Sequence, residues 1–240
     1  MSAGAEGDAE PAMTQAAAES SIAVCWCRLE PDADRWRVVA YVNGPDGELL
    51  LRYVRAHPAT GDIHPILHGT AVAPGDSLGL TEVLGVRVGI AICSELWLPE
   101  AVRTLAVRGA ELILAPAGGG FGKVAENWRL IARARAIENN FFVGMTHSRY
   151  GGEPCIGLIA GPEEVVADGE GSEDELVVAE LDLARARWLR GIDDSMKNPK
   201  PFSSLPGLVR AARPELYADL SADRPGSYDY GRAGEGASGS

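Results

Sequence analysis

The stretch GVRVGIAICSELWLPEAVRTLAVRGAELILAPA, residues 85–117, decides the fold of this chain. Its first part alternates apolar residues with small or charged ones over residues 86–92, which is the period of two of a pleated strand. Pro99 suits the first turn of a helix, and Gly109 suits the C-terminal cap of that helix. A second strand begins at Glu111, so the stretch predicts a βαβ unit whose two strands are parallel.

Cys93 stands where the first of these strands ends. Open α/β sheets keep their chemistry at the carboxyl ends of parallel strands, which favours a reactive cysteine. A small apolar thiol is also a common core residue. The composition alone therefore leaves two interpretations of Cys93 open, a nucleophile and a packed core residue.

Four further segments accompany ICSELWLPE in a fixed order along the chain. They are GPDGELLLRY (residues 44–53), Ala73-Pro74-Gly75, WRLIARARAIENNFFV (residues 128–143) and RPELY (residues 213–217). This ordered set resembles the nitrilase, or carbon–nitrogen hydrolase, superfamily over about residues 16–220. The resemblance implies an α/β fold, the nitrilase-like α-β-β-α sandwich, with each protomer supplying two of the four layers.

The resemblance also implies the chemistry of the site. Cys93 corresponds to the nucleophile, which attacks the carbon of an amide, nitrile or carbamoyl group and forms a thioester that water then opens. The family's lysine closes a Tyr-x-Lys motif, and here Arg55 takes its place in Tyr53-Val54-Arg55. The backbone N–H of Ser94 is expected to donate to the oxyanion. The candidate pocket residues are Glu95, Trp97 and Gly118.

The family's glutamate base lies on the second strand from its N-terminus, and this chain is expected to begin after that strand. We expect the sandwich to be N-terminally truncated, either through a start codon assigned too late or in the protein itself. The predicted function is hydrolysis of a non-peptide carbon–nitrogen bond. The alternative is a catalytically degenerate homologue that acts as a binding or structural subunit, and a thiol redox protein is disfavoured because Cys93 has no CxxC partner.

Composition limits the partners. The 240 residues carry a net charge of −12, which argues against nucleic acid and against an anionic membrane surface. No apolar run is long enough to span a bilayer. We expect a small-molecule amide or nitrile substrate, no cofactor, no metal, and a homodimer or a subunit of a larger complex.

The cysteines and histidines complete this view. Four cysteines in a chain of this length are no disulfide scaffold, so the cytoplasm is the expected compartment. Cys25 and Cys27 fall on one face of a strand, where core packing is favoured over a metal site. His57, His64 and His68 lie in a long irregular stretch without a converging ligand set, and His147 is expected in a loop or in a hydrogen bond.

The expected domain organisation is a disordered leader over residues 1–14, one hydrolase-like domain over 15–220, and a disordered tail over 221–240. GGGFGK at residues 118–123 lacks the spacing of a phosphate-binding loop. Besides the βαβ unit, strands are expected at residues 22–28, 36–43, 49–54, 141–146, 155–160 and 176–181.

Overall fold

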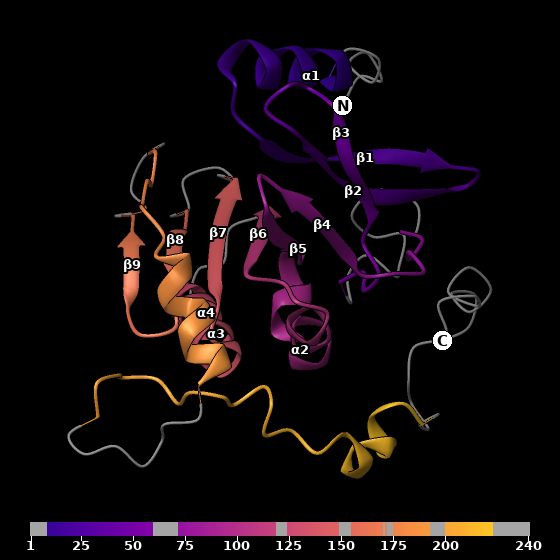
Figure 1. Cartoon of the computed structure of the whole chain (residues 1–240). Helices are drawn as coiled ribbons and strands as arrows, with labels where there is room; N and C mark the ends of the chain where they lie inside the picture. The colour runs from indigo at the N-terminus through magenta and orange to yellow at the C-terminus, as the bar shows by residue number, and fades with distance from the viewer. Residues whose placement is uncertain are drawn as a thin grey trace.

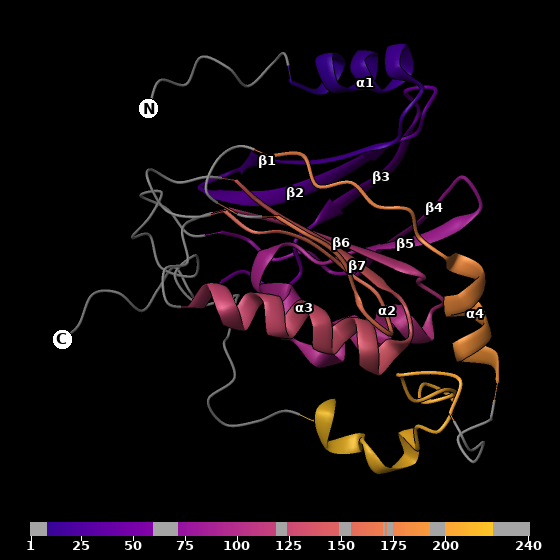
Figure 2. The same cartoon turned by 90° about the vertical axis from the view of Figure 1, so that its left-hand side faces the viewer.

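Four layers follow one another across the molecule, and Figure 2 shows them edge-on. Helix α1 (Ala9–Ser20) covers a three-stranded sheet, which faces a six-stranded sheet, and helices α2 (Pro99–Val107) and α3 (Ala125–Asn139) cover the far side. This computed structural model describes residues 9–59, 72–118, 124–148, 155–169, 171, 175–192 and 200–222. The α-β-β-α order confirms the predicted fold class. One chain contains all four layers, so the expectation that each protomer supplies only two is wrong.

The smaller sheet is an antiparallel meander of β1 (Val24–Asp32), β2 (Arg35–Asn43) and β3 (Leu49–Val54). The hairpin between β2 and β3 turns at Gly47, which has a φ of +85° and so adopts a conformation that favours glycine. A Cβ at Gly47 would also lie 2.8 Å from the carbonyl oxygen of Thr14 in α1. The predicted hairpin is therefore confirmed.

The larger sheet has the strand order β4-β5-β6-β7-β8-β9, with β5, β6 and β7 parallel and the outer pairs antiparallel (Figure 1). Its strands are β4 (Gly79–Val83), β5 (Val86–Ile90), β6 (Leu112–Gly118), β7 (Phe142–Ser148), β8 (Gly157–Ala160) and β9 (Val165–Asp168). The chain from β5 through α2 to β6 is the predicted βαβ unit. Pro99 opens α2, and Gly109 follows it with a φ of +99°.

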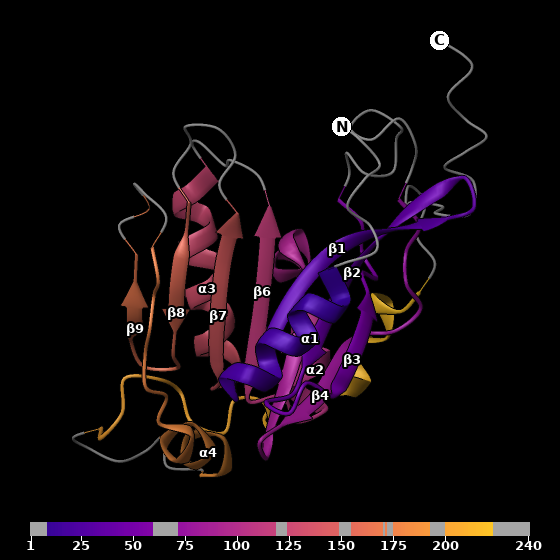
Figure 3. The same cartoon turned by 90° about the horizontal axis from the view of Figure 1, so that it is seen from above.

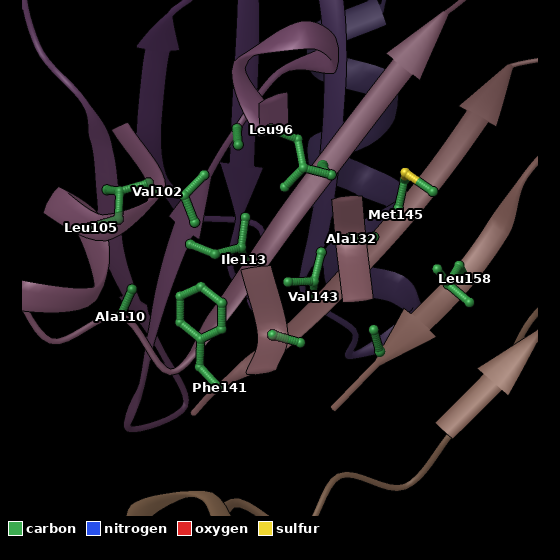
Figure 4. Close-up of a cluster of buried hydrophobic side chains, with 14 of the residues drawn as sticks. Leu96, Val102, Leu105, Ala110, Ile113, Ala132, Phe141, Val143, Met145 and Leu158 are labelled. Atoms are coloured by element: carbon green, nitrogen blue, oxygen red, sulfur yellow. The ribbon is translucent and has the colours of Figure 1, made fainter. Parts of the chain in front are cut away.

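The main core lies between the six-stranded sheet and the helices α2 and α3, as Figure 4 shows. Leu105 of α2, Ile113 of β6 and Phe141 before β7 are each fully buried there. A second cluster fills the space between the two sheets, where Tyr53 and Ala40 meet Ile90. Removing a side chain of this size from such a core typically costs about 2–5 kcal/mol of unfolding free energy.

The structure corrects the expectation for the N-terminal end of the chain. Residues 9–14 form the first half of α1 rather than a disordered leader, because Ala17 is fully buried and Glu10 pairs with Arg28 at 3.0 Å. Residues 1–8 and 223–240 lie outside the described residues. Residues 200–222 run below the helices with 3-10 turns at Pro214–Leu216 and Ala218–Leu220.

Some strands and one helix of the structure differ from those that the sequence predicted. Residues 176–181 pair with no strand among the described residues, so the strand expected there is wrong. The sequence analysis did not identify β4, β9 or the helix α4 (Leu183–Gly191). Within the part of the chain that is described, no helix has both the length and the apolar composition to cross a membrane.

Candidate active site

Cys93 sits on a strained corner of the backbone. Two residues separate it from the end of β5; it has a φ of +53° and begins the 3-10 turn Cys93–Trp97. A non-glycine residue in this region costs about 1–2 kcal/mol, and such strain is concentrated at functional sites. The side chain is half-buried and contacts both core clusters. The role of Cys93 as a nucleophile stays a prediction.

Arg135 of α3 fixes the turn that follows Cys93. Its Nε donates to the carbonyl of Leu96 at 2.9 Å, and its Nη2 donates to the carbonyl of Trp97 at 3.0 Å. The guanidinium is buried and also pairs with Glu138 at 3.0 Å. Charged hydrogen bonds of this kind are shorter and stronger than neutral ones. The sequence analysis quoted this helix without assigning Arg135 a role, and the RAxEN ending was the available signal.

Glu95 is a buried carboxylate that ties the turn to the end of β3. Its Oε1 accepts hydrogen bonds from the Tyr53 hydroxyl at 2.7 Å and from the backbone N–H groups of Ala56 and His57 at 2.9 and 3.0 Å. Its Oε2 accepts from the N–H of Ile92 at 2.8 Å. These donors compensate for burying the charge. Glu95, a candidate pocket residue, therefore positions the chain on both sides of the site.

Arg55 reaches the residue next to Cys93. Its Nη2 donates to the Ser94 hydroxyl oxygen at 2.5 Å, and the side chain is 4% exposed. The backbone of Arg55 is held on both sides, since its N–H donates to Val38 at 2.9 Å and its carbonyl accepts from Gly75 at 2.8 Å. The structure thus brings Arg55 to Ser94, the residue after Cys93, and the roles of the three residues in catalysis stay a prediction.

The turn Ala73-Pro74-Gly75 contributes to this arrangement through close backbone approach. A Cβ on Gly75 would lie 2.4 Å from the carbonyl oxygen of Val54, so only glycine fits without displacing the strand that carries Arg55. A Cβ on Gly79 would lie 2.6 Å from the ring of Tyr53. Burial, followed by the neighbouring Glu95, raises the pKa of Tyr53 well above its usual range. Tyr53 therefore keeps its proton, and its hydroxyl donates a hydrogen bond to Glu95.

The two remaining candidate pocket residues lie apart from these contacts. Gly118 ends β6 and pairs with Ser148 at the end of β7, at the edge where the parallel strands have their carboxyl ends (Figure 3). Trp97 is half-buried against the main core and meets the ring of Trp128 edge-on, with centroids 5.4 Å apart. Gly118 thus shares the sheet edge with Cys93, whereas Trp97 packs into the core.

The other cysteines differ from Cys93. Burial raises the pKa of the Cys25 thiol to about 12, and Cys25 packs against the cluster between the sheets. Cys27 shares its strand face but is exposed, so the core packing expected for both residues is wrong for Cys27. Desolvation, then Cys25, still raises the pKa of Cys27 to about 12. Both groups remain thiols at neutral pH, and neither is an activated nucleophile.

The histidines form no metal site among the residues that the structure describes. His57 lies beside Glu95, with Nδ1 3.4 Å from its Oε1. His147 lies on β7 rather than in a loop, and its ring meets Trp128 edge-on at 5.2 Å. Burial, followed by Arg129, lowers the pKa of His147 to about 4. His64 and His68 fall outside the described residues.

A four-layer α-β-β-α sandwich with a strained cysteine at the carboxyl edge of its parallel strands defines a nitrilase-like protein. The family model described as carbon–nitrogen hydrolase matches residues 4–190, and the chain belongs to this family. Its members as a class are hydrolases of carbon–nitrogen bonds.

Curated relatives resemble the chain in sequence, and a solved structure resembles it in fold. The chain is 29% identical over 194 residues to the omega-amidase NIT2 of Bos taurus, covering 77% of this chain and 70% of that protein. It is 34% identical over 147 residues to the hydrolase MT0498 of Mycobacterium tuberculosis, covering 55% of this chain and 52% of that protein. The structure of a carbon–nitrogen hydrolase from Helicobacter pylori G27 matches with a TM-score of 0.75 and 22% identity, over 89% of this chain and 75% of that one.

Proposed function

We propose that this chain hydrolyses the amide bond of a small molecule through a thioester on Cys93. The observation that carries the proposal is the strained Cys93 at the end of β5 with the buried guanidinium of Arg55 bound to the neighbouring Ser94. Among the amide, nitrile and carbamoyl substrates that this nucleophile could attack, the amide is favoured because the curated relatives include omega-amidases.

The proposed reaction has two steps. The Cys93 thiol gives up its proton, and the thiolate forms a bond to the amide carbon. The tetrahedral intermediate then collapses by breaking the carbon–nitrogen bond, and the leaving nitrogen takes up the proton from the thiol and departs as ammonia. Water then attacks the thioester, which releases a carboxylic acid and restores the thiol. The backbone N–H of Ser94 and the charge of Arg55 stabilise the oxyanion in both steps, a contribution typically worth roughly a hundred- to a thousandfold in rate per donor.

Glu95 is a positioning residue in this scheme rather than the base. Both of its oxygens already accept hydrogen bonds, from Tyr53 and two N–H groups on one side and from Ile92 on the other. A carboxylate that left these donors to take a proton would leave buried N–H groups unpaired, at about 1–3 kcal/mol each. We therefore do not propose Glu95 as the base that accepts the proton of the Cys93 thiol.

One observation favours a second candidate, a catalytically degenerate homologue that serves as a binding or structural subunit. Arginine stands where the family has lysine, and its guanidinium is larger, forked and always charged, so it cannot act as a proton carrier. In this candidate the same contact between Arg55 and Ser94 only stabilises the turn.

The test is turnover of a defined panel: short aliphatic amides, the ω-amides of dicarboxylic acids and the matching nitriles. The amidase proposal expects steady ammonia release together with an acyl adduct on Cys93 in mass spectra. Cys93→Ala should lose both signals, and Cys155→Ala is the matched control that should keep them. Absence of ammonia release and of adduct across the panel would contradict the amidase and favour the degenerate homologue.

We also propose a cellular compartment and an oligomeric state for this protein. All four cysteines are free thiols, which supports a reducing compartment such as the cytoplasm. We also propose a homodimer or a subunit of a larger complex, for which the exposed apolar side chains on α2 and α3 provide the support.

A further inference from the structure

A groove lies between the helical layer and the C-terminal segment of the chain. Its volume is about 490 Å³, which is in the range of small-molecule sites. One wall is the N-terminal half of α2 together with the end of α3, and the other wall is part of residues 208–220. Figures 1 and 2 both show this segment below the helices. Neither Cys93 nor Arg55 lines the groove, so it is distinct from the candidate active site.

The C-terminal wall of the groove is apolar. Its 3-10 turn Ala218–Leu220 follows Tyr217, and the N–H of Leu220 donates to the Tyr217 carbonyl at 3.0 Å. Side chains three positions apart eclipse one another in 3-10 geometry, so Tyr217 and Leu220 lie on one side of the segment. The two residues are 46% and 55% exposed, and together with Leu208 they line the groove. A ligand with an apolar side chain would remove this surface from water.

The helical wall carries two side chains of opposite charge. Glu100 and Arg103 are three positions apart on α2, so they share one face of the helix, and both line the groove. Among the residues that the structure describes, the Glu100 carboxylate forms neither a hydrogen bond nor an ion pair. A second acid, Glu138, also lines the groove, but its carboxylate pairs with Arg135 at 3.0 Å. Glu100 is therefore the acid that is available to a cationic group.

Arg103 has a buried nitrogen without an acceptor. Its Nη2 donates to the carbonyl of Glu138 at 2.8 Å, at the end of α3. Its Nη1 is buried and has no hydrogen-bond partner in the described part of the chain. Such donors are rare in folded proteins, because no hydrogen bond offsets the hydration that the group has lost. An anionic group bound in the groove would supply the missing acceptor.

We propose that this groove binds a free amino acid with an apolar side chain. The ligand carboxylate accepts from Nη1 of Arg103, the ligand ammonium group pairs with Glu100, and the ligand side chain packs against Tyr217 and Leu220. This inference does not rest on the proposed function.

Charge complementarity selects this class of ligand. An α-amino acid carries its ammonium and carboxylate groups on one carbon, and Glu100 and Arg103 offer the opposite charges on neighbouring positions of one helix face. A simple carboxylic acid would leave Glu100 without a partner beside a second negative charge. A simple amine would leave Nη1 of Arg103 without an acceptor. Only a zwitterion satisfies both groups.

The probe is L-phenylalanine, titrated into the full chain by isothermal titration calorimetry. We expect saturable binding with a Kd below about 1 mM. 3-Phenylpropionate lacks the ammonium group and should bind roughly threefold more weakly, whereas 2-phenylethylamine lacks the carboxylate and should bind roughly tenfold more weakly. No saturable binding up to about 10 mM L-phenylalanine, or equal binding of the three compounds, would overturn the proposal.

Two charge variants locate the contacts. Glu100→Gln should weaken L-phenylalanine roughly threefold and should not weaken 3-phenylpropionate, which has no ammonium group. Arg103→Gln should weaken both of these ligands roughly tenfold and should not weaken 2-phenylethylamine. Arg108→Gln, at the exposed C-cap of α2, is the matched control and should change none of the affinities.

The remaining outcomes separate this groove from other sites. If Arg103→Gln does not fold, Glu100→Gln decides alone because it changes an exposed side chain, and unchanged L-phenylalanine binding in that variant would refute the site. Cys93→Ala should bind L-phenylalanine as the wild type does, and loss of binding would place the probe at the candidate active site and overturn the proposal. A wild-type dimer that binds no L-phenylalanine and that Leu220→Glu dissociates would assign the groove to a second copy and overturn it as well.

Discussion

The guanidinium of Arg55 donates to the hydroxyl oxygen of Ser94 at 2.5 Å, which fixes a buried positive charge one residue from Cys93. The two residues are 39 positions apart in the chain. The contact depends on the backbone of Arg55 being held by Val38 and Gly75. The small sheet therefore determines where the Arg55 charge lies, whereas the large sheet determines where the Cys93 thiol lies.

Arg55 provides the first prediction. If its charge stabilises the oxyanion, Arg55→Ala should lower kcat/KM on the amide substrate by roughly a hundred- to a thousandfold. Arg55→Lys should retain the activity because it restores the family's residue. Arg52→Ala, which removes a more exposed arginine from β3, three residues before Arg55, is the control. Unchanged turnover in Arg55→Ala would show that the charge has no part in the reaction.

The second prediction concerns thiol reactivity. Limiting iodoacetamide should label Cys93 well before Cys25 or Cys27, because burial or desolvation raises the pKa of both of the latter to about 12. The thiolate is the reactive form, so these two cysteines should react slowly at neutral pH. Adducts are mapped by mass spectrometry of the folded protein. Preferential labelling of Cys25 or Cys27 would remove the basis for Cys93 as the nucleophile.

Glu95→Gln tests the positioning role. The amide nitrogen of glutamine is itself a donor, and it must face either the Tyr53 and His57 donors or the N–H of Ile92. In either orientation at least one of these donors loses its hydrogen-bond acceptor. We expect the unfolding free energy to fall by about 1–3 kcal/mol and turnover to fall with it. Urea unfolding measures the first effect. Glu100→Gln on the exposed start of α2 is the matched control, and equal stability of the two variants would contradict the role.

A pH dependence follows from His147. Its pKa falls from about 6.5 in the unfolded chain to about 4 in the fold, so the folded state binds fewer protons. The stability contributed by the neutral ring is complete above about pH 6.5 and is lost as the pH falls toward 4. Between pH 7.5 and 4.5 the wild type should lose about 2 kcal/mol more unfolding free energy than His147→Phe. The same loss in both proteins would refute this.

Assembly is the last prediction. Val107 of α2 and Leu130 of α3 are 66% and 64% exposed on the helical layer. Burying such apolar side chains against a second copy would remove them from water. We expect light scattering at micromolar concentration to show a dimer or a larger species that Leu130→Glu dissociates. Leu84→Glu, at an exposed turn between β4 and β5, should leave the mass unchanged. A well-folded wild-type monomer would contradict the prediction.

Local chemistry in the sequence determined much of the fold. The alternation in residues 86–92, Pro99 and Gly109 specify a strand, a helix start and a helix end within one stretch, because each signal acts on its own backbone or on near neighbours. The hairpin at Gly47 follows for the same reason. The order of the motifs led to the family, and with it to Cys93, Arg55 and Ser94 as the residues to examine.

Only the tertiary structure decided what those residues contact. Tyr53, His57 and Arg135 belong to the site because Glu95 and the turn after Cys93 accept their hydrogen bonds. Residues 176–181 have a strand's alternation yet remain unpaired, and Cys27 faces inward yet remains exposed. A residue pattern specifies which backbone conformation is favourable, but pairing and burial depend on which distant segments arrive beside it. Pairing and burial are therefore determined only when the whole chain has packed.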